Sequence, residues 1–430
     1  MKYLVGAILM ASFFISCKNQ NSKIVSKVYV DSLINHYTLP QQAKDNEADL
    51  EFWKSRIDPK QSRQVNESKY ASTLIARFHL FGDIQDVKQA EAIYKNINKT
   101  YNSSLASPFV ALTSSAMLQH HFSQADTLLE KAKKIGVDNF TLYTLSFDVN
   151  FELGRYIKSS LYLNSLKSDK DYSYYFRRSK YDHFNGTIDS AISGMMQAAK
   201  LAKASPYLKG IALSNAADLN IHAGKLQKAG EIYKECLRLN SADFHSILGL
   251  GWLTLVHDKN DTLAERLFKF VLTKNKLPDP LFKLYQMAQE RGDKSLEKRY
   301  ANEFVAKSTD TVYGQMYNKY VIEIYTGILN NPSKAEDLAK NELNNRATPQ
   351  TYAWYAYTLF ENNKKDEAYK VFQQHVSGQP LEGLELYYMG KMMKGLGKGY
   401  NAGEFFKAAE KNKYDLSPDQ EKDLQKSLEE

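Results

Sequence analysis

Nine histidines are the first residues of this chain that could hold a metal ion. His120 and His121 are adjacent, and adjacent residues of a helix point about 100° apart, so they do not chelate one ion as an i, i+4 pair would. The chain has no His-Glu-x-x-His segment and no paired Cys-x-x-Cys segments. The sequence therefore predicts no metal site, and we expect the histidines to have structural or surface roles.

Four glycines near the end of the chain, Gly395, Gly397, Gly399 and Gly403, lie close enough together to suggest a phosphate-binding loop. The segment lacks the Gly-Lys-Ser/Thr ending of a P-loop and does not follow a strand pattern, as a dinucleotide-binding loop does. The chain also has no Gly-x-Ser-x-Gly segment, and its acidic residues are spread too evenly to mark an acid and base pair. The sequence therefore predicts a helix-ending turn here, no cofactor and no enzymatic activity.

The segment 171–184, which reads DYSYYFRRSKYDHF, is the densest cluster of aromatic and basic residues in the chain. Tyrosine and arginine are the residue types that dominate the hot spots of binding interfaces. The segment therefore predicts a ligand groove. The alternative is that its aromatic rings belong to the core and its arginines are solvated, and the sequence leaves both readings open.

The elements that position these residues follow from a regular rhythm. The same three-residue pattern recurs every 32 to 38 residues. It consists of a residue that is usually small, a bulky residue four positions later and another packing residue three positions after that. A fixed period in this range is typical of stacked supersecondary units. The ten copies begin at Ala90, Ala125, Ser159, Ala191, Ala229, Ala264, Glu297, Ala335, Ala368 and Ala402.

Apolar residues recur at i, i+3, i+4 and i+7 from about 70 to 415, which predicts amphipathic helices. Short breaks that contain glycine or asparagine, such as Gly224-Lys225 and Asn362-Asn363, precede most copies and predict the turns within helix pairs. The predicted organisation is residues 1–16 as a signal peptide, 17–68 as a tether with N-terminal helices, 69–415 as the repeat array and 416–430 as a capping helix that starts at Ser417.

One copy carries a specific resemblance. Residues 349–359 read PQTYAWYAYTL, and Ala368, Phe372 and Pro380 follow in register, so the copy resembles a tetratricopeptide repeat almost position for position. The next copy continues the pattern with Gly390 at the small site of its first helix. The resemblance implies an all-α fold, a right-handed superhelical solenoid of about ten antiparallel helix pairs.

In the tetratricopeptide-repeat family the first helices line a concave groove, and its groove positions can be carried over to this sequence. The family's clamp for a C-terminal carboxylate is not found in register here, although Asn215 stands at one of its places. The resemblance and the aromatic and basic cluster together give the candidate groove residues, which are Phe176, Arg177, Arg178, Lys180, His183, Asp148 and Asp218.

The start of the chain resembles a bacterial lipoprotein signal. Lys2 is followed by an uncharged run from Leu4 to Ile15 and then by Ser16-Cys17, a small residue before a cysteine. The resemblance implies cleavage before Cys17 and acylation of that residue. Phe14 stands where leucine is usual. With the repeats, the pattern is similar to the tetratricopeptide-repeat lipoproteins of the Bacteroidota type.

With Cys17 acylated, Cys236 is left as a single thiol, and it stands where neighbouring copies have alanine or valine. A small buried core residue is the expected role, since no nearby base marks a reactive thiol. The chain has 57 basic and 49 acidic residues, a net charge of +8, and both signs are mixed throughout. This pattern is typical of a solvated surface and, with the export signal, argues against nucleic acid as a partner.

The sequence thus predicts a lipid-anchored, non-catalytic repeat scaffold in the bacterial cell envelope that binds a protein or peptide partner. The alternative is a peptide- or glycan-binding accessory component of an outer-membrane uptake complex, although gaps of at most 38 residues leave no room for a large ligand-binding insertion. Residues 18–20 are Lys-Asn-Gln, so the residues after Cys17 are basic and amidic. Lipoproteins of this type that are exported to the cell surface tend to have a lysine followed by acidic residues, so the sequence favours the periplasmic side of the outer membrane.

Overall fold

The structure is a computed structural model in which residues 23–58 and 64–430 are described. Within these residues every regular element is a helix. Two helices precede the repeats, α1 (Lys27–Asn35) and α2 (Gln41–Ser55), and α23 (Pro418–Glu429) follows them. Two short 3-10 helices are present, η1 (Thr311–Tyr313) and η2 (Lys413–Asp415). Residue Cys17 and the predicted signal peptide lie outside the described residues.

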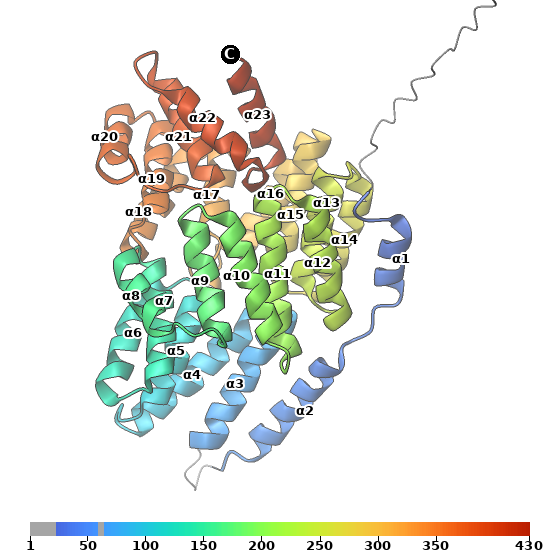
Figure 1. The fold of residues 1–430 in the computed structure, drawn as a ribbon, viewed down its shortest axis with the longest axis vertical. Coiled ribbons are helices and arrows are strands. Elements are labelled where there is room, and N and C mark those ends of the chain that lie inside the picture. Colours follow the sequence, from blue (N-terminus) through green and yellow to red (C-terminus); the bar gives the residue numbers. More distant parts are fainter. Residues whose placement is uncertain (1–22, 59–63) are drawn as a thin grey trace, which may run out of the picture.

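Ten helix pairs follow one another from α3 to α22, and each second helix packs against the first helix of its pair (Figure 1). The first helices are α3 (Gln64–Phe81), α5 (Ala106–Leu118), α7 (Asn139–Glu152), α9 (Tyr172–Phe184), α11 (Pro206–His222), α13 (Phe244–Val256), α15 (Asp279–Arg291), α17 (Asn318–Thr326), α19 (Pro349–Glu361) and α21 (Gly383–Leu396). The second helices are α4 (Ile84–Thr100), α6 (Phe122–Ile135), α8 (Tyr156–Ser165), α10 (Ile188–Leu201), α12 (Leu226–Leu239), α14 (Asp261–Lys274), α16 (Lys294–Ser308), α18 (Pro332–Asn345), α20 (Lys365–His375) and α22 (Ala402–Lys411). The predicted all-α solenoid of helix pairs is confirmed.

The residues that start the ten copies all lie on the second helices. Nine of them are buried, and Ala402 is half-buried. The unusual copy at Glu297 also belongs to the array, because its side chain is buried and its carboxylate accepts hydrogen bonds from Lys294 at 2.7 Å and Gln289 at 3.4 Å. A small residue at this site lets the two helices of a pair approach closely, and a paired carboxylate is tolerated there in one repeat.

The turns within pairs use the left-handed backbone that glycine and asparagine favour. Gly154 and Gly224 have φ angles of 73° and 69°, and Asn363 has 61°. His120 holds the corresponding turn of the second pair at a φ of 57°. His120 and His121 therefore lie in a turn, and not on a helix as their adjacency was interpreted from the sequence.

Contacts between pairs that are far apart in sequence close the solenoid on itself. The backbone N–H of Phe122 donates to the side chain of Asn345 at 2.8 Å, and the Asn345 amide donates to the carbonyl of His120 at 2.6 Å. In the first pair, the carbonyl of Phe81 accepts from the backbone N–H of Lys276 at 2.8 Å. These contacts, which we call the seams, join the turns of early pairs to the linkers between late pairs.

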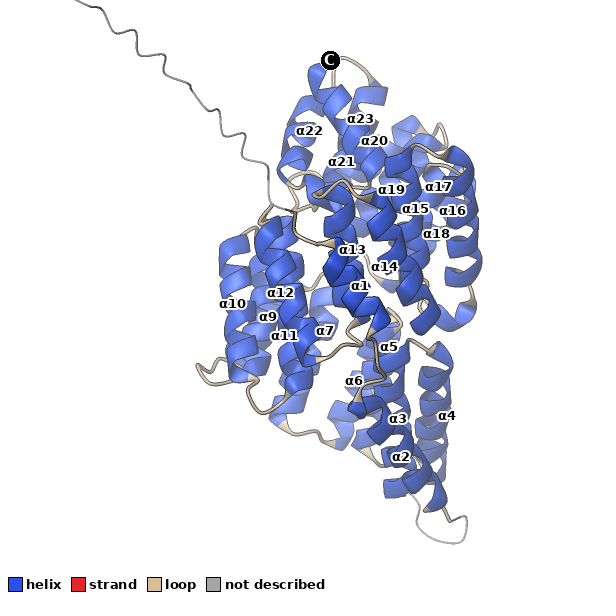
Figure 2. Cartoon of the chain, turned by 90° about the vertical axis from the view of Figure 1, so that its right-hand side faces the viewer, coloured by secondary structure: helices blue, strands red, loops and turns tan. Residues whose placement is uncertain are grey.

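Both ends of the described chain pack onto the array. The segment before α1 and α1 itself lie along α12 and α14, so part of the predicted tether region is docked (Figure 2). At the other end, the predicted capping box of Ser417 and Gln420 is present at the start of α23. This helix packs against both α22 and α15, so it also bridges distant pairs. Within the described residues, no helix is long and apolar enough to cross a membrane.

Two glycines mark the closest approach of helices within pairs. A Cβ at Gly251 of α13 would lie 2.4 Å from the ring of Phe268 on α14, and a Cβ at Gly390 of α21 would lie 2.5 Å from the ring of Phe406 on α22. Phe268 and Phe406 are the bulky residues of their copies, four positions after the small one. The small site of the first helix and the bulky site of the second therefore form one contact.

We predict that Gly251→Ala and Gly390→Ala each lower the free energy of unfolding by about 1 to 3 kcal/mol, because the new methyl group overpacks the facing ring. Gly210→Ala is the matched control, since nothing lies within 4 Å of a Cβ at that helical position. The control should gain about 0.5 to 1 kcal/mol from helix propensity alone. Thermal and urea unfolding of the three variants measure this, and equal effects at all three positions would contradict the packing argument.

Candidate functional site

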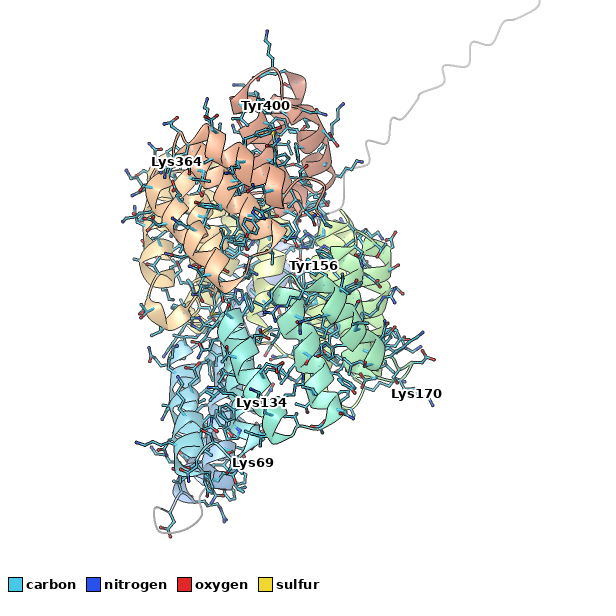
Figure 3. The ribbon with its side chains drawn as sticks, turned by 90° about the vertical axis from the view of Figure 1, so that its left-hand side faces the viewer. Lys69, Lys134, Tyr156, Lys170, Lys364 and Tyr400 are labelled. Carbon is cyan, nitrogen blue, oxygen red and sulfur yellow. The ribbon has the colours of Figure 1, made fainter. Side chains whose placement is uncertain are left out.

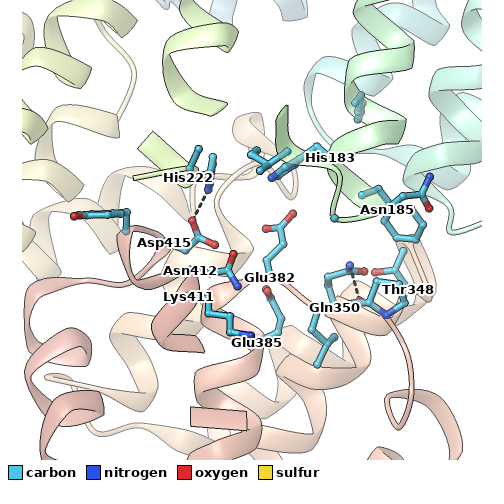
Figure 4. Close-up of a pocket in the computed structure, with 18 of the residues that line it drawn as sticks. His183, Asn185, His222, Thr348, Gln350, Glu382, Glu385, Lys411, Asn412 and Asp415 are labelled. Carbon is cyan, nitrogen blue, oxygen red and sulfur yellow. Dashed lines mark hydrogen bonds and ion pairs between the residues drawn. The ribbon is translucent and has the colours of Figure 1, made fainter. Parts of the chain in front are cut away.

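The structure contains a cavity of about 1000 Å³ that is partly open to solvent. On one side it is lined by the C-terminal ends of the first helices α7, α9 and α11, and on the other by the linkers and helix ends from α17 to η2. Figure 4 shows His183 and His222 extending from the first side toward Glu382 and Asp415 on the second. Figure 3 places Tyr156, another lining residue, midway along the molecule. The seams therefore turn what would be an open groove into a central cavity.

Charged residues of both signs line this cavity in equal number. Most of them are paired with each other across the two sides or along one side. The six basic residues are Lys180, Lys225, Lys319, Arg346, Lys411 and Lys413, and the six acidic residues are Glu152, Asp189, Glu382, Glu385, Glu410 and Asp415.

Glu152, at the end of α7, is the best compensated carboxylate of the cavity. Lys180 of α9 donates a short hydrogen bond to it, and Arg346, just after α18, reaches it at 3.3 Å. Burial by itself would raise the pKa of Glu152, but the charges of Lys180 and Arg346 outweigh burial and lower it to about 2. Lys180 also lies 4.7 Å from the centre of the Phe151 ring. This group ties three distant helices together at neutral pH.

Glu385, on α21, has a different environment. Its side chain is fully buried, and it accepts a hydrogen bond of 2.6 Å from the indole N–H of Trp354. Lys319 is 3.6 Å from Glu385 and 3.5 Å from Glu382, so one ammonium group serves two carboxylates. Burial raises the pKa of Glu385, which Lys319 only partly opposes, and the net pKa is raised. The charge of Glu385 is therefore less well compensated by cations than the charge of Glu152.

His222, at the end of α11, forms a short hydrogen bond through Nδ1 with Asp415 of η2. Asp415 also accepts from the backbone N–H of Gly383 at 3.0 Å. Burial alone would lower the pKa of His222, but the hydrogen bond and charge of Asp415 outweigh it and raise that pKa. The neighbouring His183 ring is 5.2 Å away, and burial with the charge of His222 lowers the pKa of His183. The two histidines therefore titrate in different pH ranges.

Three aromatic rings on the α7 to α9 side pack on one another. Tyr156 and Phe184 are stacked with centroids 3.9 Å apart, and Phe151 lies edge-on to both at 5.5 and 5.7 Å. Burial, followed by the charge of Glu152, raises the pKa of Tyr156 to about 12. The rings thus stabilise the wall of the cavity through contacts among themselves.

Two of the seven predicted groove residues, Lys180 and His183, line the cavity. Arg177 instead donates a hydrogen bond of 2.5 Å to Asp148 and another of 3.2 Å to the carbonyl of Thr144, so it links α9 to α7. Phe176 stacks on Tyr172 with centroids 5.7 Å apart and packs against the core. The adjacent side chains of the aromatic and basic cluster therefore have separate roles.

The other two predicted residues lie outside the cavity. Arg178 pairs with Asp182 of its own helix at 2.7 Å and lines an open depression between α9 and α10. Asp218 of α11 accepts hydrogen bonds from the hydroxyl of Tyr233 and, at 2.9 Å, from His245. The structure therefore brings Lys180 and His183 together but places Asp218 with a different set of partners.

Sequence reasoning missed Lys319, Arg346, Glu382, Glu385 and Asp415, which form the second side of the cavity. Arg346, Glu382 and Asp415 lie in the segments that connect helix pairs, where polar residues are ordinary. The one signal in the sequence was that Arg346, Glu382 and Asp415 all lie in the segments that follow the last three helix pairs. Only the seams make these linkers face the first helices of earlier pairs.

The lining offers ion pairs and hydrogen bonds to a bound group, and the His222–Asp415 pair would orient a proton at the remaining ring nitrogen. No serine or cysteine lines the described cavity to act as a nucleophile beside it. Within residues 23–58 and 64–430 there is no group of three or more histidine, cysteine, aspartate or glutamate side chains placed to hold a metal ion. The charged lining can bind a polar ligand.

Comparison with known proteins gives similarity of fold. No protein-family model and no curated protein matches the chain. A human IFIT1 dimer with m7Gppp-AAAA has a TM-score of 0.48 at 10% identity, and the match covers 77% of this chain and 75% of that one. A tetratricopeptide repeat protein from Parabacteroides merdae has a TM-score of 0.35 at 15% identity, with 60% and 99% covered. The helix pairs form a tetratricopeptide-like repeat fold.

A third similar structure is a signal transduction ATPase with a tetratricopeptide repeat sensor, PH0952 from Pyrococcus horikoshii. It has a TM-score of 0.43 at 16% identity, and the match covers 78% of this chain and 55% of that one. All three neighbours share the repeat architecture, and the ligands and activities in their names belong to those proteins.

We predict that the His222–Asp415 pair contributes to stability in a pH-dependent way. Because the pKa of His222 is raised, its contribution is fully present below about 6.5, the pKa of an unfolded histidine, and is lost as pH rises through the raised pKa. Because the pKa of Asp415 is lowered, the contribution is also lost as pH falls through that lowered value. The pair should therefore stabilise the fold most at mildly acidic pH.

His222→Ala tests this by urea unfolding at a series of pH values. We expect a loss of about 1 to 3 kcal/mol near pH 5.5 that becomes smaller at alkaline pH. His36→Ala is the control, since His36 is exposed and bonded only to the carbonyl of Ser32 in its own helix. A loss for His222→Ala that does not change with pH would show that packing, and not the ion pair, carries the effect.

Proposed function

We propose that this chain is a lipid-anchored, non-catalytic repeat scaffold of the bacterial cell envelope that binds a segment of a partner protein in its central cavity. The observation that carries the proposal is the cavity itself. Its volume of about 1000 Å³ is at the upper end of the range of ligand pockets, about 300 to 1,000 Å³. A space of this size accommodates a short stretch of polypeptide.

The chemistry of the lining favours a polypeptide. Six basic and six acidic residues present no excess positive charge, which binding to a phosphate backbone requires. A glycan would need open aromatic faces, but Tyr156 and Phe184 cover each other and Trp354 is only 3% exposed. A polypeptide supplies backbone donors and acceptors and side chains of both signs, which can pair with the basic and acidic residues of the lining.

The anchoring part of the proposal rests on the lipoprotein-like signal that ends at Cys17. Acylation of that residue would hold the chain on a membrane, and the basic and amidic residues after it favour the periplasmic side of the outer membrane. The likeness to tetratricopeptide-repeat lipoproteins of the Bacteroidota type supports the same location. The membrane affinity of an acyl chain comes from its buried methylenes, and a single chain binds a bilayer only weakly and reversibly. A stable anchor therefore needs more than one chain.

Replacing the acceptor of the lipid tests the anchor. We expect Cys17→Ala to move the protein from the membrane fraction to the soluble fraction of cells. Cys236→Ala is the matched control, because Cys236 is buried and alanine stands at this site in neighbouring repeats, so the protein should remain on the membrane. Membrane association of Cys17→Ala equal to that of the control would refute the anchor.

Site-specific photocrosslinking in intact cells tests binding in the cavity. A photoreactive amino acid at Lys411, which lines the cavity, should capture a partner protein, and the same group at the exposed Lys134 of α6 should not. The captured band should disappear when Ala223→Trp fills the cavity. Identical capture at both positions, or capture that survives filling, would contradict the proposal. Saturable binding of free oligosaccharides to the purified protein would favour the uptake-component alternative.

A further inference from the structure

The chain just after the proposed acylation site is held by a clasp centred on Asp258. The backbone N–H groups of Ile24 and Val25 donate to the two carboxylate oxygens of Asp258, each at 2.8 Å. His257 contacts the same carboxylate at 2.7 Å through Nδ1, and the Lys234 ammonium donates to the carbonyl of Ile24 at 2.6 Å. The Asp258 side chain is fully buried. A buried carboxylate with three partners is a strong and specific hold on a backbone segment.

The side chains of this segment belong to the core. Ile24 and Val25 are 4% and 1% exposed, and both are part of the largest hydrophobic cluster. Gly230 of α12 makes room for Ile24, because a Cβ there would lie 2.2 Å from the isoleucine side chain. A helix interior otherwise disfavours glycine, so its presence fits the need for this close approach.

Helix α1 extends the contact after the clasp. Asp31 pairs with Arg266 of α14 at 2.7 Å, and Tyr37, just beyond α1, lies edge-on to Phe270 with centroids 5.3 Å apart. Part of the region 17–68, which the sequence predicts to be a tether with N-terminal helices, is therefore docked, from Ile24 to Tyr37. In the sequence, a linker of six residues, 18–23, stands between Cys17 and Ile24.

The length of this linker limits how the protein can sit on a bilayer. Seven residue steps separate Cys17 from Ile24, and fully extended they span at most about 25 Å. A compact body of about 400 residues has a radius of gyration near 21 Å and is therefore more than about 50 Å across. The linker cannot reach around such a body, so the surface beside Ile24 must lie next to the lipid.

We propose that the Asp258 clasp fixes the orientation of the body on the membrane, so that the side that carries α1 and the α13–α14 turn faces the lipid surface and the side that carries α6 points away. The inference rests on the proposed acylation of Cys17 and adds which surface meets the bilayer. Figure 1 places α1 and α14 on the right-hand side of the molecule and α6 on the left-hand side, which is the side that faces the viewer in Figure 3, where Lys134 is labelled. The surface beside the clasp carries the exposed residues Lys23, Lys27 and Val28, which suit contact with lipid headgroups.

The test uses acylated full-length protein on vesicles of phosphatidylethanolamine and phosphatidylglycerol with a headgroup-bound fluorescent acceptor. A donor dye is attached at Lys228→Cys, on α12 beside the clasp, or at Lys134→Cys, both exposed positions in a Cys236→Ala background. We expect energy transfer at least about twofold higher from position 228, since the two sides of the body differ in height by tens of ångströms. Equal transfer from the two positions would overturn the proposal.

A flexible insert of about 20 Gly and Ser residues after Ser22 adds about 25 Å of mean reach and leaves the clasp intact. We expect it to abolish most of the difference between the two dyes. The same insert in the exposed turn at Asn102 and Ser103 is the control and should leave the difference unchanged. A difference that survives the insert after Ser22 would show that a surface other than the clasp sets the orientation.

The outcomes separate this inference from the anchor itself. Protein that fails to float with the vesicles refutes acylation at Cys17. Protein that floats but shows equal transfer refutes only the fixed orientation. Asp258→Asn gives a second variant, because it removes the negative charge and replaces one of the two acceptor oxygens with an NH2 donor. It should reduce the difference while the melting temperature reports that the fold is intact, and an unchanged difference would count against the clasp.

Discussion

The architecture depends on the contact of Asn345 with the α5–α6 turn. Its carboxamide accepts from the N–H of Phe122 and donates to the carbonyl of His120, which is 225 residues away in sequence. Repeat arrays need contacts only between neighbours, so a contact of this range sets the pitch of the superhelix. Opening the solenoid would exchange these hydrogen bonds for bonds to water, at a net cost of about 0.5 to 1.5 kcal/mol for each. The cavity has a fixed shape because its walls are joined in this way.

The repeat pattern predicts the fold because each small residue at the start of a copy packs inside one helix pair, and that packing is local. The seams are not predictable in the same way. Lys276 and Asn345 are ordinary polar residues of linkers and helix ends, and their partners are determined by small rotations accumulated over several pairs. The same reason explains the site: Lys180 and His183 follow from helix register, whereas Arg346 and Glu385 enter only when distant pairs meet.

Charge in the cavity is balanced in number but not in position. Glu152 has two cationic partners and a pKa of about 2, whereas Glu385 and Glu382 share Lys319 at 3.5 to 3.6 Å. The free energy needed to bury a carboxylate is larger than the attraction that one distant cation supplies. The region around Glu385 would therefore be stabilised most by an additional cation. A cationic group in the cavity would therefore be favoured on the side of α21. This asymmetry gives orientation to a ligand whose overall charge is matched.

The fifth and sixth pairs connect the cavity to the start of the described chain. Helix α11 reaches the cavity through His222 and its bond to Asp415, and α12 and α14 hold the N-terminal segment through Gly230 and Arg266. These helices belong to one continuous hydrophobic cluster that also contains Ile24 and Val25. Close-packed protein interiors have low compressibility and transmit strain. The wall of the cavity at His222 and the N-terminal clasp are therefore joined through α11 to α14 by contiguous core packing.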